Sequence, residues 1–559
     1  MTDILSLTDL KTASAYQIAV FEHVAAQIIA QSKGEKVKNL VVEATAGSGK
    51  TTTNVAMSNL FTRPSRKILT GTTAMRDLAV MYLAFNKPIA DELQSRLKQG
   101  EAKTLNSLGW GIWRRYYETV NHGKKAQMVK GNKLRTITRN LYSYAERENY
   151  GDDVIFLAEK AISSGFAPSM TKLPAVGIDG KSDTDENLMG TSYHFGRAIA
   201  PKDRPTVFRM VRELLKAAFE DEGNCSFDDQ KWFSVVKRTS IGTPINAFKY
   251  DAILVDEAQD LSPLDAALVK MVCKKNTITV FVGDREQSLY GFRGADARSI
   301  DNLIETFETA VLPLSITYRC GTRIVEEAKT VSNRIEARPN AHEGLVSELD
   351  AYDATIFQPN DKVVCRNNAP LVALAFKLIG AKVPVHMMGR DLGANLISVI
   401  NKVCGRKGAN GYEFGSKTVR DLVTGIQKWQ AEQQVMILEA DPDDEAAIQA
   451  LSDRVATIMV FVQENTDGKI TSVIASIREL FGTETFGAEK APVGKVVLSS
   501  VHRAKGLEAD RVFILNRSLF RPHWVKQGTW QYQQEINVEF VAITRAKNEI
   551  YYIELENYQ

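Results

Sequence analysis

The sequence contains few cysteines, and none is placed to hold a metal or a cluster. There are five in 559 residues, widely scattered and without a Cys-x-x-Cys pair. Closely spaced cysteines are needed for zinc and iron–sulfur sites and are typical of disulfide frameworks. The sequence therefore argues against all three and favours a reducing compartment. The cysteines are Cys225, Cys273, Cys320, Cys365 and Cys404.

The sequence also lacks a large net charge and a long apolar run. The formal net charge is +3, so any contact with nucleic acid must be local and cannot come from an overall basic character. No apolar run reaches the length of a membrane span, and the first residues carry no basic leader with an apolar core. With 44% hydrophobic and 25% charged residues, we expect a globular, cytoplasmic protein without a membrane partner.

Strand-like apolar runs alternate with helical patterns along the chain, which is too long for one hydrophobic core. This alternation predicts parallel sheets and the α/β fold class. The expected strands are Asn39–Val42, Val80–Ala84, Asp251–Val255, Ile278–Val282, Lys362–Cys365, Val496–Leu498, Val512–Leu515 and Glu549–Ile553.

Two helical stretches interrupt the alternation, and we expect both to be insertions into α/β domains. The second, 377–489, has a polar, acidic break at Glu439–Glu445. The first, 106–240, carries a basic cluster that either contacts nucleic acid or is only a solvated helix face. The cluster consists of Lys124, Lys125, Lys130, Lys133, Arg135 and Arg139.

A glycine-rich segment, Ala44–Thr51, reads ATAGSGKT and lies between an apolar run and a helix-like segment. Its small residues let the backbone N–H groups turn toward phosphates, and Gly47 and Gly49 supply the tight curvature. Lys50 offers a charge to the outer phosphates, and Thr51 can ligate magnesium. The segment therefore predicts a phosphate-binding loop.

The general pattern of such a loop begins with glycine, where this sequence has Ala44. A glycine-rich turn that caps an ordinary helix is the alternative. A Gly-Lys-Thr sequence at a strand-to-helix junction favours the phosphate loop.

An acidic pair, Asp256 and Glu257, follows the apolar residues 252–255. The carboxyl end of a buried strand is where α/β sheets bind ligands. We expect Asp256 to hold magnesium and Glu257 to orient or deprotonate the water that attacks a γ-phosphate. Acidic pairs also cap helices, but the phosphate loop favours the catalytic interpretation.

Seven blocks in this order resemble the UvrD type of superfamily 1 helicases, the group that includes Rep and PcrA. The loop sequence ATAGSGKT matches the variant found in that family, which accounts for Ala44. The sequences of two segments, LAFNK at 83–87 and YGFRGA at 290–295, are more similar to the F-box DNA helicase branch of the family. Besides the loop, the blocks are Tyr16–Gln17, Val282–Ala295, Thr317–Arg319, Cys365–Asn368, Val501–Glu508 and Val541–Ala546.

This resemblance implies ATP and Mg²⁺ as cofactors. Gln17 would read the adenine, Tyr318 stack on it, Glu508 meet the ribose and Gln287 the γ-phosphate. The arginine fingers would be Arg319 and Arg545, whose rigid, permanently charged guanidinium groups suit the charge that spreads over the γ-phosphate; a surface ion pair is the alternative for Arg319. Because both lie in the second α/β domain, the resemblance implies that ATP binds between the two domains. The phosphates would be held by Ala46, Gly47, Ser48, Gly49, Lys50, Thr51 and Thr52, and the metal by Thr51 and Asp256.

The resemblance also implies a track for single-stranded DNA and for junctions of single and double strands. Tyr290 and Phe292 can stack on bases without regard to sequence, and a buried core position is the alternative for them. The spacing between Phe85 and Asn86 is one residue shorter than in UvrD. Asn106 stands at a position that usually carries a histidine in this family. The implied DNA-binding residues are Phe85, Asn86, Thr104, Asn106, Tyr290, Phe292, Arg293, Arg366, Asn367 and His502.

We expect two RecA-like domains, each with a helical insertion, in an ATP-dependent DNA helicase for replication, repair or recombination. The sequence of Lys505–Glu508 is typical of the UvrD branch. This resemblance implies that the protein moves 3′ to 5′ on single strands and unwinds duplex. The alternatives are a translocase that strips proteins from DNA and an ATP-switched loading subunit. Single-strand-binding or replication proteins are candidate partners. The expected boundaries are 1–105 and 241–310 for domain 1A, 106–240 for 1B, 311–376 and 490–559 for 2A, and 377–489 for 2B.

The chain ends soon after Arg545, and few residues precede Gln17. From this we expect no F-box, no nuclease domain and no strand-separating pin beyond the arginine block. Either the basic cluster or the segment Phe520–Trp524 would then separate the strands, and Trp524 beside a proline suits a wedge.

Overall fold

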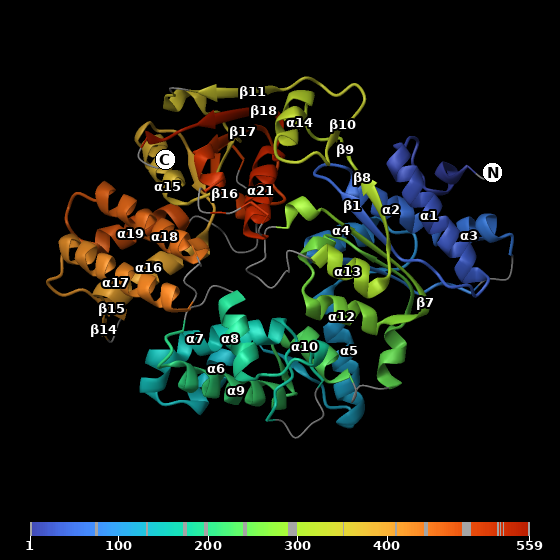
Figure 1. Cartoon of the computed structure of the whole chain (residues 1–559), viewed down its shortest axis with the longest axis horizontal. Helices are drawn as coiled ribbons and strands as arrows, with labels where there is room; N and C mark the ends of the chain where they lie inside the picture. The colour runs from blue at the N-terminus through green and yellow to red at the C-terminus, as the bar shows by residue number, and fades with distance from the viewer. Residues whose placement is uncertain are drawn as a thin grey trace. The chain divides into compact units, whose positions relative to one another are not determined.

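The structure is a computed structural model, and it is built from two compact units, Met1–Ile316 and Thr317–Gln559. Each unit has its own six-stranded sheet (Figure 1). The structure describes residues 3–72, 76–129, 132–170, 176–194, 199–238, 243–288, 299–349, 352–408, 411–440, 445–482, 493–522, 525, 527–528 and 530–556.

The first unit is organised by a sheet with the strand order β3-β2-β6-β7-β1-β8, in which every pairing is parallel. Parallel strands are covered on both faces, which explains why the central ones are continuous apolar runs. The strands are β1 (Leu40–Ala44), β2 (Val80–Ala84), β3 (Glu101–Thr104), β6 (Tyr250–Val255), β7 (Cys273–Gly283) and β8 (Ala310–Leu314).

Helices connect these strands and begin at recognisable caps. In α1, Ser14 and Gln17 form a reciprocal capping box that satisfies the first turn. The helices of this layer are α1 (Ala15–Ser32), α2 (Lys50–Leu60), α3 (Arg63–Thr70), α4 (Lys87–Arg96), α12 (Pro263–Met271) and α13 (Ser299–Phe307).

Between β3 and β6 the chain forms a group of helices around an aromatic core. The Trp113 and Phe233 rings lie 4.7 Å apart, and the Phe219 and Trp232 rings 5.1 Å apart. The group consists of α5 (Leu105–Val120), α6 (Lys133–Leu141), α7 (Tyr144–Ser163), α8 (Asp185–His194), α9 (Arg204–Glu220), α10 (Asp229–Val236), and the short strands β4 (Gln127–Met128) and β5 (Asn224–Cys225).

The basic cluster predicted in this stretch is only partly a surface feature. Lys133 is buried, and its ammonium donates to the Asp229 carboxylate at 2.9 Å and to the Ala218 carbonyl at 2.9 Å. A buried lysine needs such partners, so its inclusion in a basic surface was wrong. Lys124, Lys125, Arg135 and Arg139 are exposed, and Lys130 lies outside the described residues.

The second unit has a sheet with the order β11-β18-β17-β12-β16-β13, again with parallel pairings throughout. Its strands are β11 (Leu345–Leu349), β12 (Lys362–Cys365), β13 (Val385–Met387), β16 (Val496–Ser500), β17 (Ala509–Leu515) and β18 (Ala546–Ile553). The helices of this layer are α14 (Thr322–Lys329), α15 (Ala369–Gly380), α20 (Val501–Ala504) and α21 (Trp530–Ile543).

A second helical group lies between β13 and β16. It is tied to the sheet layer by Asp453, whose carboxylate accepts from the N–H groups of Asn368 and Ala369 at the start of α15. Of the predicted acidic break, 441–444 lie outside the described residues, between α17 and α18. The group contains α16 (Arg390–Cys404), α17 (Val419–Ala440), α18 (Glu445–Glu464), α19 (Ile470–Phe481), and the strands β14 (Arg406–Gly408) and β15 (Gly411–Glu413).

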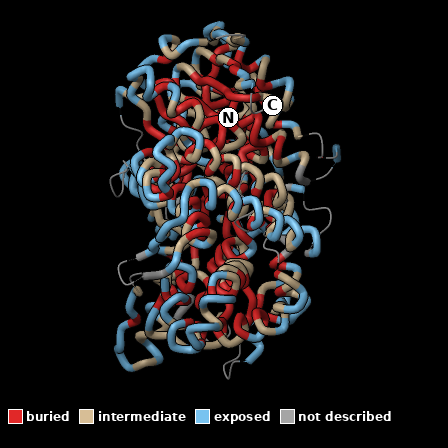
Figure 2. Tube along the Cα trace, turned by 90° about the vertical axis from the view of Figure 1, so that its left-hand side faces the viewer, coloured by how far each residue is buried: buried red, intermediate tan, exposed pale blue. Residues whose placement is uncertain are grey.

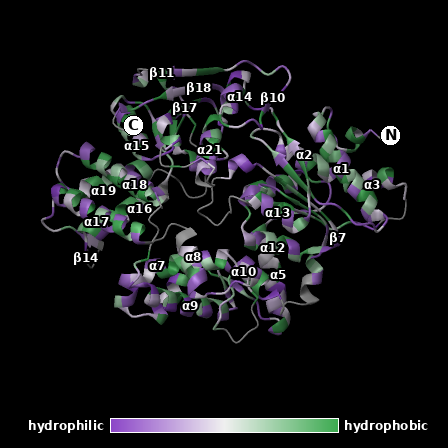
Figure 3. Ribbon diagram, in the orientation of Figure 1, coloured by the Kyte–Doolittle hydropathy of each residue, from purple (hydrophilic) through white to green (hydrophobic). Residues whose placement is uncertain are grey.

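Burial follows the strands and the inward faces of the helices (Figure 2). The helices carry apolar and polar residues on different faces, as amphipathic packing requires (Figure 3). No helix within the described residues is both long and apolar enough to cross a membrane. The prediction of an α/β fold with two parallel sheets is confirmed.

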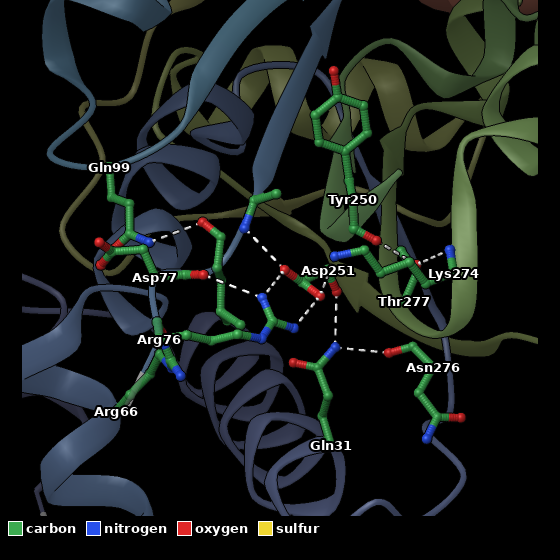
Figure 4. A network of polar contacts seen from close by, with 12 residues as sticks. Gln31, Arg66, Arg76, Asp77, Gln99, Tyr250, Asp251, Lys274, Asn276 and Thr277 are labelled. Atoms are coloured by element: carbon green, nitrogen blue, oxygen red, sulfur yellow. Dashed lines mark hydrogen bonds and ion pairs between the residues drawn. The ribbon is translucent and has the colours of Figure 1, made fainter. Parts of the chain in front are cut away.

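A buried carboxylate, Asp251, ties together the amino-terminal ends of the strands in the first sheet (Figure 4). The Arg76 guanidinium donates to its two oxygens at 2.6 and 2.7 Å, and the Lys274 ammonium donates to it at 2.7 Å. The Ala79 N–H donates to it at 2.9 Å. Burial alone raises the pKa of the Asp251 carboxyl, but these donors outweigh it and lower the pKa to about 2.

Replacing Asp251 with asparagine should therefore lower the free energy of unfolding at neutral pH by on the order of 2 kcal/mol. The pKa of Asp251 is lower in the folded state than in the unfolded chain. The stabilisation that its carboxylate contributes is therefore complete above about pH 4 and is lost as the pH falls toward 2. Urea unfolding at several pH values measures it. Asp77→Asn is the control, since the Asp77 pair with Arg63 is exposed. Equal stability of Asp251→Asn and the wild type at pH 7 would contradict this role.

Candidate nucleotide site and nucleic-acid face

The predicted catalytic residues of the first unit gather at the carboxyl edge of its sheet. Strands β6, β7 and β1 are neighbours, and their ends lead into Asp256, Asp284 and the phosphate loop. Parallel strands deliver their carboxyl ends to one edge, so segments more than 200 residues apart in the sequence meet there.

The phosphate loop has the backbone of an anion site. Gly47 and Gly49 adopt positive φ angles of 70° and 80°, and α2 begins directly at Lys50. Ala44 is the last residue of β1 and is buried in the sheet, so this position needs no glycine. The Thr45 and Ser48 hydroxyl oxygens are buried without a hydrogen-bond partner. Unsatisfied buried polar atoms beside a helix N-terminus fit a bound triphosphate.

The acidic pair lies beside this loop. The Lys50 ammonium is 3.9 Å from Glu257 Oε1, and the Asn54 side chain hydrogen-bonds the Asp256 carboxyl. Burial, with the nearby negative charge of Glu257, raises the pKa of Asp256 to about 7. A cation would reverse this effect, so the pair fits the Mg²⁺ that accompanies ATP. Thr51, the other predicted ligand, is partly exposed in the first turn of α2, and Thr52 is exposed.

Two predicted nucleotide-contacting glutamines are buried near the loop. The Gln17 amide donates to Thr53 Oγ1 at 3.0 Å, and its carbonyl oxygen accepts the Ser14 N–H at 3.0 Å. The Gln287 amide donates to Asp284 Oδ2 at 2.7 Å. Both are therefore held by the protein, and their contacts with ATP stay predictions.

In the second unit, Arg319, Glu508 and Arg545 lie at the amino-terminal ends of β17 and β18. Arg319 Nε is 2.6 Å from Glu508 Oε2, and its Nη1 donates to the Thr544 carbonyl at 2.8 Å. Arg545 is buried, and its Nε donates to the Val541 carbonyl at 3.0 Å. The predicted ribose partner and one predicted arginine finger thus bind each other in this structure.

Two further features of this end of the second sheet bear on the predicted nucleotide contacts. Tyr318 is 45% exposed, as a stacking residue requires. A cavity of about 360 Å³ opens beside Glu508 and is also lined by Lys362 and Lys547.

At the opposite end of the same sheet, the predicted DNA-contacting residues of the second unit follow β12 and β16. Arg366 forms a bidentate pair with Glu535, both distances being 2.7 Å. Burial, with the nearby charge of Arg366, lowers the pKa of His502 to about 3, so the imidazole is neutral at pH 7. Asn367 is partly exposed beside Arg366. A phosphate contact by Arg366 would require exchange of its carboxylate partner.

The predicted DNA-contacting residues of the first unit lie beyond β2 and β3, which are neighbours. Phe85 is 49% exposed. Asn86 and Thr104 accept backbone N–H groups as the N-caps of α4 and α5. The Asn106 amide donates to the Phe227 carbonyl at 2.7 Å.

Phe227 was not singled out from the sequence, yet this residue is 66% exposed. Its place beside Asn106 results from the packing of α10 against α5, which no local pattern encodes. The predicted residues Tyr290, Phe292, Arg293 and Trp524 lie outside the described residues.

The first half of the chain matches a known family. The model of the UvrD/REP helicase N-terminal domain matches residues 25–308, about half of the chain. The chain is 22% identical to F-box DNA helicase 1 of Gallus gallus over 555 residues, which cover 93% of this chain and 48% of the relative.

Two relatives from Schizosaccharomyces pombe match shorter segments. F-box DNA helicase protein 1 is 25% identical over 328 residues, 54% of this chain and 34% of the relative. ATP-dependent DNA helicase srs2 is 41% identical over 115 residues, 20% of this chain and 13% of the relative. The chain thus spans about half or less of the length of these curated relatives.

The resemblance inferred from the sequence blocks is thereby confirmed. The match covers the segment that carries the phosphate loop, the acidic pair and Gln287. The chain belongs to the UvrD/REP helicase family.

Proposed function

We propose that this protein is an ATP-dependent DNA helicase that moves 3′ to 5′ on single-stranded DNA and unwinds duplex in repair or recombination. The observation that carries the proposal is the convergence of the phosphate loop, Asp256–Glu257 and Gln287 on one edge of the first sheet. Several relatives, which are named DNA helicases in different organisms, support the same activity.

Each group of residues in the site has its own proposed role in the hydrolysis of ATP. The loop N–H groups and Lys50 bind and orient the phosphates, and Thr51 and Asp256 would hold Mg²⁺, which supplies charge neutralisation at the triphosphate. Glu257 orients or deprotonates the attacking water. Arg319 and Arg545 are the proposed donors to the charge that develops on the γ-phosphate.

ATP turnover measured with single-stranded DNA, duplex DNA and RNA side by side tests the substrate class. Stimulation by single-stranded DNA is the expected result, and turnover that no nucleic acid stimulates would contradict it. Polarity is tested with duplexes that carry a 3′ or a 5′ single-stranded tail. Unwinding of the 5′-tailed duplex alone would contradict the proposed direction, which rests on the sequence of residues 505–508.

Phe85 and Phe227 are proposed to stack on bases, because both rings are exposed next to the predicted DNA-contacting blocks. Phe227→Ala should weaken single-strand binding by about 1 to 3 kcal/mol, to a similar extent for different base sequences, since every base has a π-face. Fluorescence anisotropy with labelled oligonucleotides measures the loss.

Tyr144→Ala is the matched control, because this aromatic residue is 61% exposed on α7 in the same unit. It should bind single strands like the wild type. Unchanged affinity in both Phe227→Ala and Phe85→Ala would contradict a stacking role for this surface.

A further inference from the structure

The Glu508 carboxylate faces a different cation at each of its two oxygens. Oε2 lies 2.6 Å from Arg319 Nε, and Oε1 lies 4.0 Å from the Lys547 ammonium. Arg319 precedes α14, Glu508 precedes β17, and Lys547 is the second residue of β18. The Glu508 side chain is 42% exposed, so a ligand can reach the carboxylate. A hydroxyl that donates to Glu508 has to share the carboxylate with these cations.

The main chain around Glu508 is fixed by two other cationic residues. The Leu507 carbonyl accepts from Arg545 Nη1 at 3.3 Å, and the Glu508 carbonyl accepts from the Lys362 ammonium at 2.9 Å. The Ala509 N–H donates to the Arg545 carbonyl at 3.1 Å. A change of partner at Glu508 is therefore an exchange by its side chain, without a shift of the strand that follows.

The Arg319 guanidinium group is engaged inside the second unit through two of its nitrogens. Nη1 donates to the Thr544 carbonyl at 2.8 Å, and Nε faces Glu508. The contact of Nε is close but is not aligned as a hydrogen bond, and no described residue accepts one from this buried atom. The pair thus lacks the two parallel hydrogen bonds that make an arginine–carboxylate pair strong. It is held by charge, so its partners can be exchanged.

The roles proposed for Arg319 and Glu508 compete with their ion pair. A sugar hydroxyl donates to a carboxylate, and a γ-phosphate accepts from a guanidinium group, so each ligand takes a group that now faces the other residue. The cavity of about 360 Å³ beside Glu508, which Lys547 also lines, lies within the size range of small-molecule sites. A sugar bound to Glu508 there would leave Arg319 without its carboxylate.

We propose that the nucleotide sugar and Arg319 compete for Glu508, so that binding of the sugar hydroxyls releases Arg319 to the γ-phosphate. Lys547 is then a positioning residue, which stays with Oε1 and holds the carboxylate in place after Arg319 leaves Oε2. The inference rests on the proposed ATPase function. It adds that the sugar, which does not react, contributes to the catalytic rate, as happens when the binding energy of a remote group is used at the reacting centre.

ATP and 2′,3′-dideoxyadenosine triphosphate, compared as substrates with saturating single-stranded DNA, test the competition. The dideoxy nucleotide offers no sugar hydroxyl to Glu508, so Arg319 stays paired. We expect its catalytic rate to be roughly 10- to 100-fold lower than that of ATP, a part of the roughly 10³-fold effect of an arginine finger. A glutamate that only binds the sugar would instead raise the KM and leave the catalytic rate unchanged. That result would overturn the inference and leave the proposed function standing.

Glu508→Gln tests the charge that holds Arg319. The amide is neutral, so Arg319 is released with either nucleotide, and the catalytic rates with ATP and with the dideoxy nucleotide should become equal. Glu326→Gln is the matched control, because Glu326 is exposed on α14 in the same unit, and it should keep the difference found in the wild type. A Glu508→Gln protein that still distinguishes the two nucleotides in catalytic rate would contradict the exchange.

Lys547→Met removes the cation at Oε1, so Arg319 holds the carboxylate more firmly. The catalytic rate with ATP should fall toward that of the dideoxy nucleotide, and Lys547→Arg should restore most of it. Lys329→Met is the matched control, since Lys329 is exposed in the last turn of α14. Thermal unfolding of every variant separates lost stability from lost positioning. Wild-type rates in Lys547→Met with both nucleotides would contradict the role of Lys547. A wild-type protein without ATP turnover would overturn the proposed function and the inference together.

Discussion

Glu257→Gln should remove nearly all ATP turnover while ATP still binds. The carboxylate is the group that can take a proton from the attacking water, and an amide of the same shape cannot. Loss of a general base costs about 10²- to 10⁴-fold in rate. In the structure Glu257 Oε2 accepts from the Gln259 amide and Oε1 faces the Lys50 ammonium. Both carboxylate oxygens therefore face donors, and the NH2 group of a glutamine would lose one of these two contacts.

Turnover is measured with saturating single-stranded DNA, and binding with a fluorescent ATP analogue. Glu308→Gln is the matched control, because Glu308 is exposed in the same unit and pairs with a surface lysine, Lys36, at 2.9 Å. That variant should turn over ATP like the wild type. A Glu257→Gln protein with near-normal turnover would remove Glu257 from the catalytic role.

Arg545→Ala should lower the catalytic rate by roughly 10³-fold, the usual size for an arginine finger, while single-stranded DNA still binds in the absence of nucleotide. The guanidinium is rigid and permanently charged, which suits the charge that spreads over the γ-phosphate oxygens. Arg545→Lys keeps the charge but loses the planar fork, so it should recover only part of the rate.

Arg545 is buried against backbone carbonyls, so a stability control is essential. Arg517→Ala provides it, because Arg517 is also partly buried in the second unit and pairs with Glu327 at 2.7 Å. It should lose stability and keep its turnover per folded molecule. If Arg545→Ala lost only DNA binding, its assignment to the γ-phosphate would be wrong.

Apolar strands were the easiest elements to predict. Val80–Ala84 and Lys362–Cys365 begin and end where the sequence pattern places them. Strand β3 was missed because its residues, Glu101–Thr104, include two charged side chains and a threonine, and β8 because it contains a proline. Both are edge strands, where one side of the ladder is unpaired and apolar residues are not demanded.

Residue types at fixed spacing determined the chemistry of the site. The phosphate loop and the acidic pair are each continuous in sequence, so the sequence alone indicated ATP and the family. Lys133 shows the limit of this reasoning. Its charge suggested a surface position, but Asp229, which pairs with it in the buried core, comes from a helix nearly 100 residues later.

The sequence by itself determined the parallel α/β class, the nucleotide chemistry and the helicase family, because these depend on local apolar runs and short contiguous blocks. Only the tertiary structure decided that Gln259 joins Glu257 to Asp284, that Glu508 binds Arg319, and that Phe227 lies exposed beside Asn106. The physical reason is that the strand order and the helix packing bring distant segments to one edge or one surface. A hydrogen bond or ion pair between such segments leaves no periodic trace in either of them.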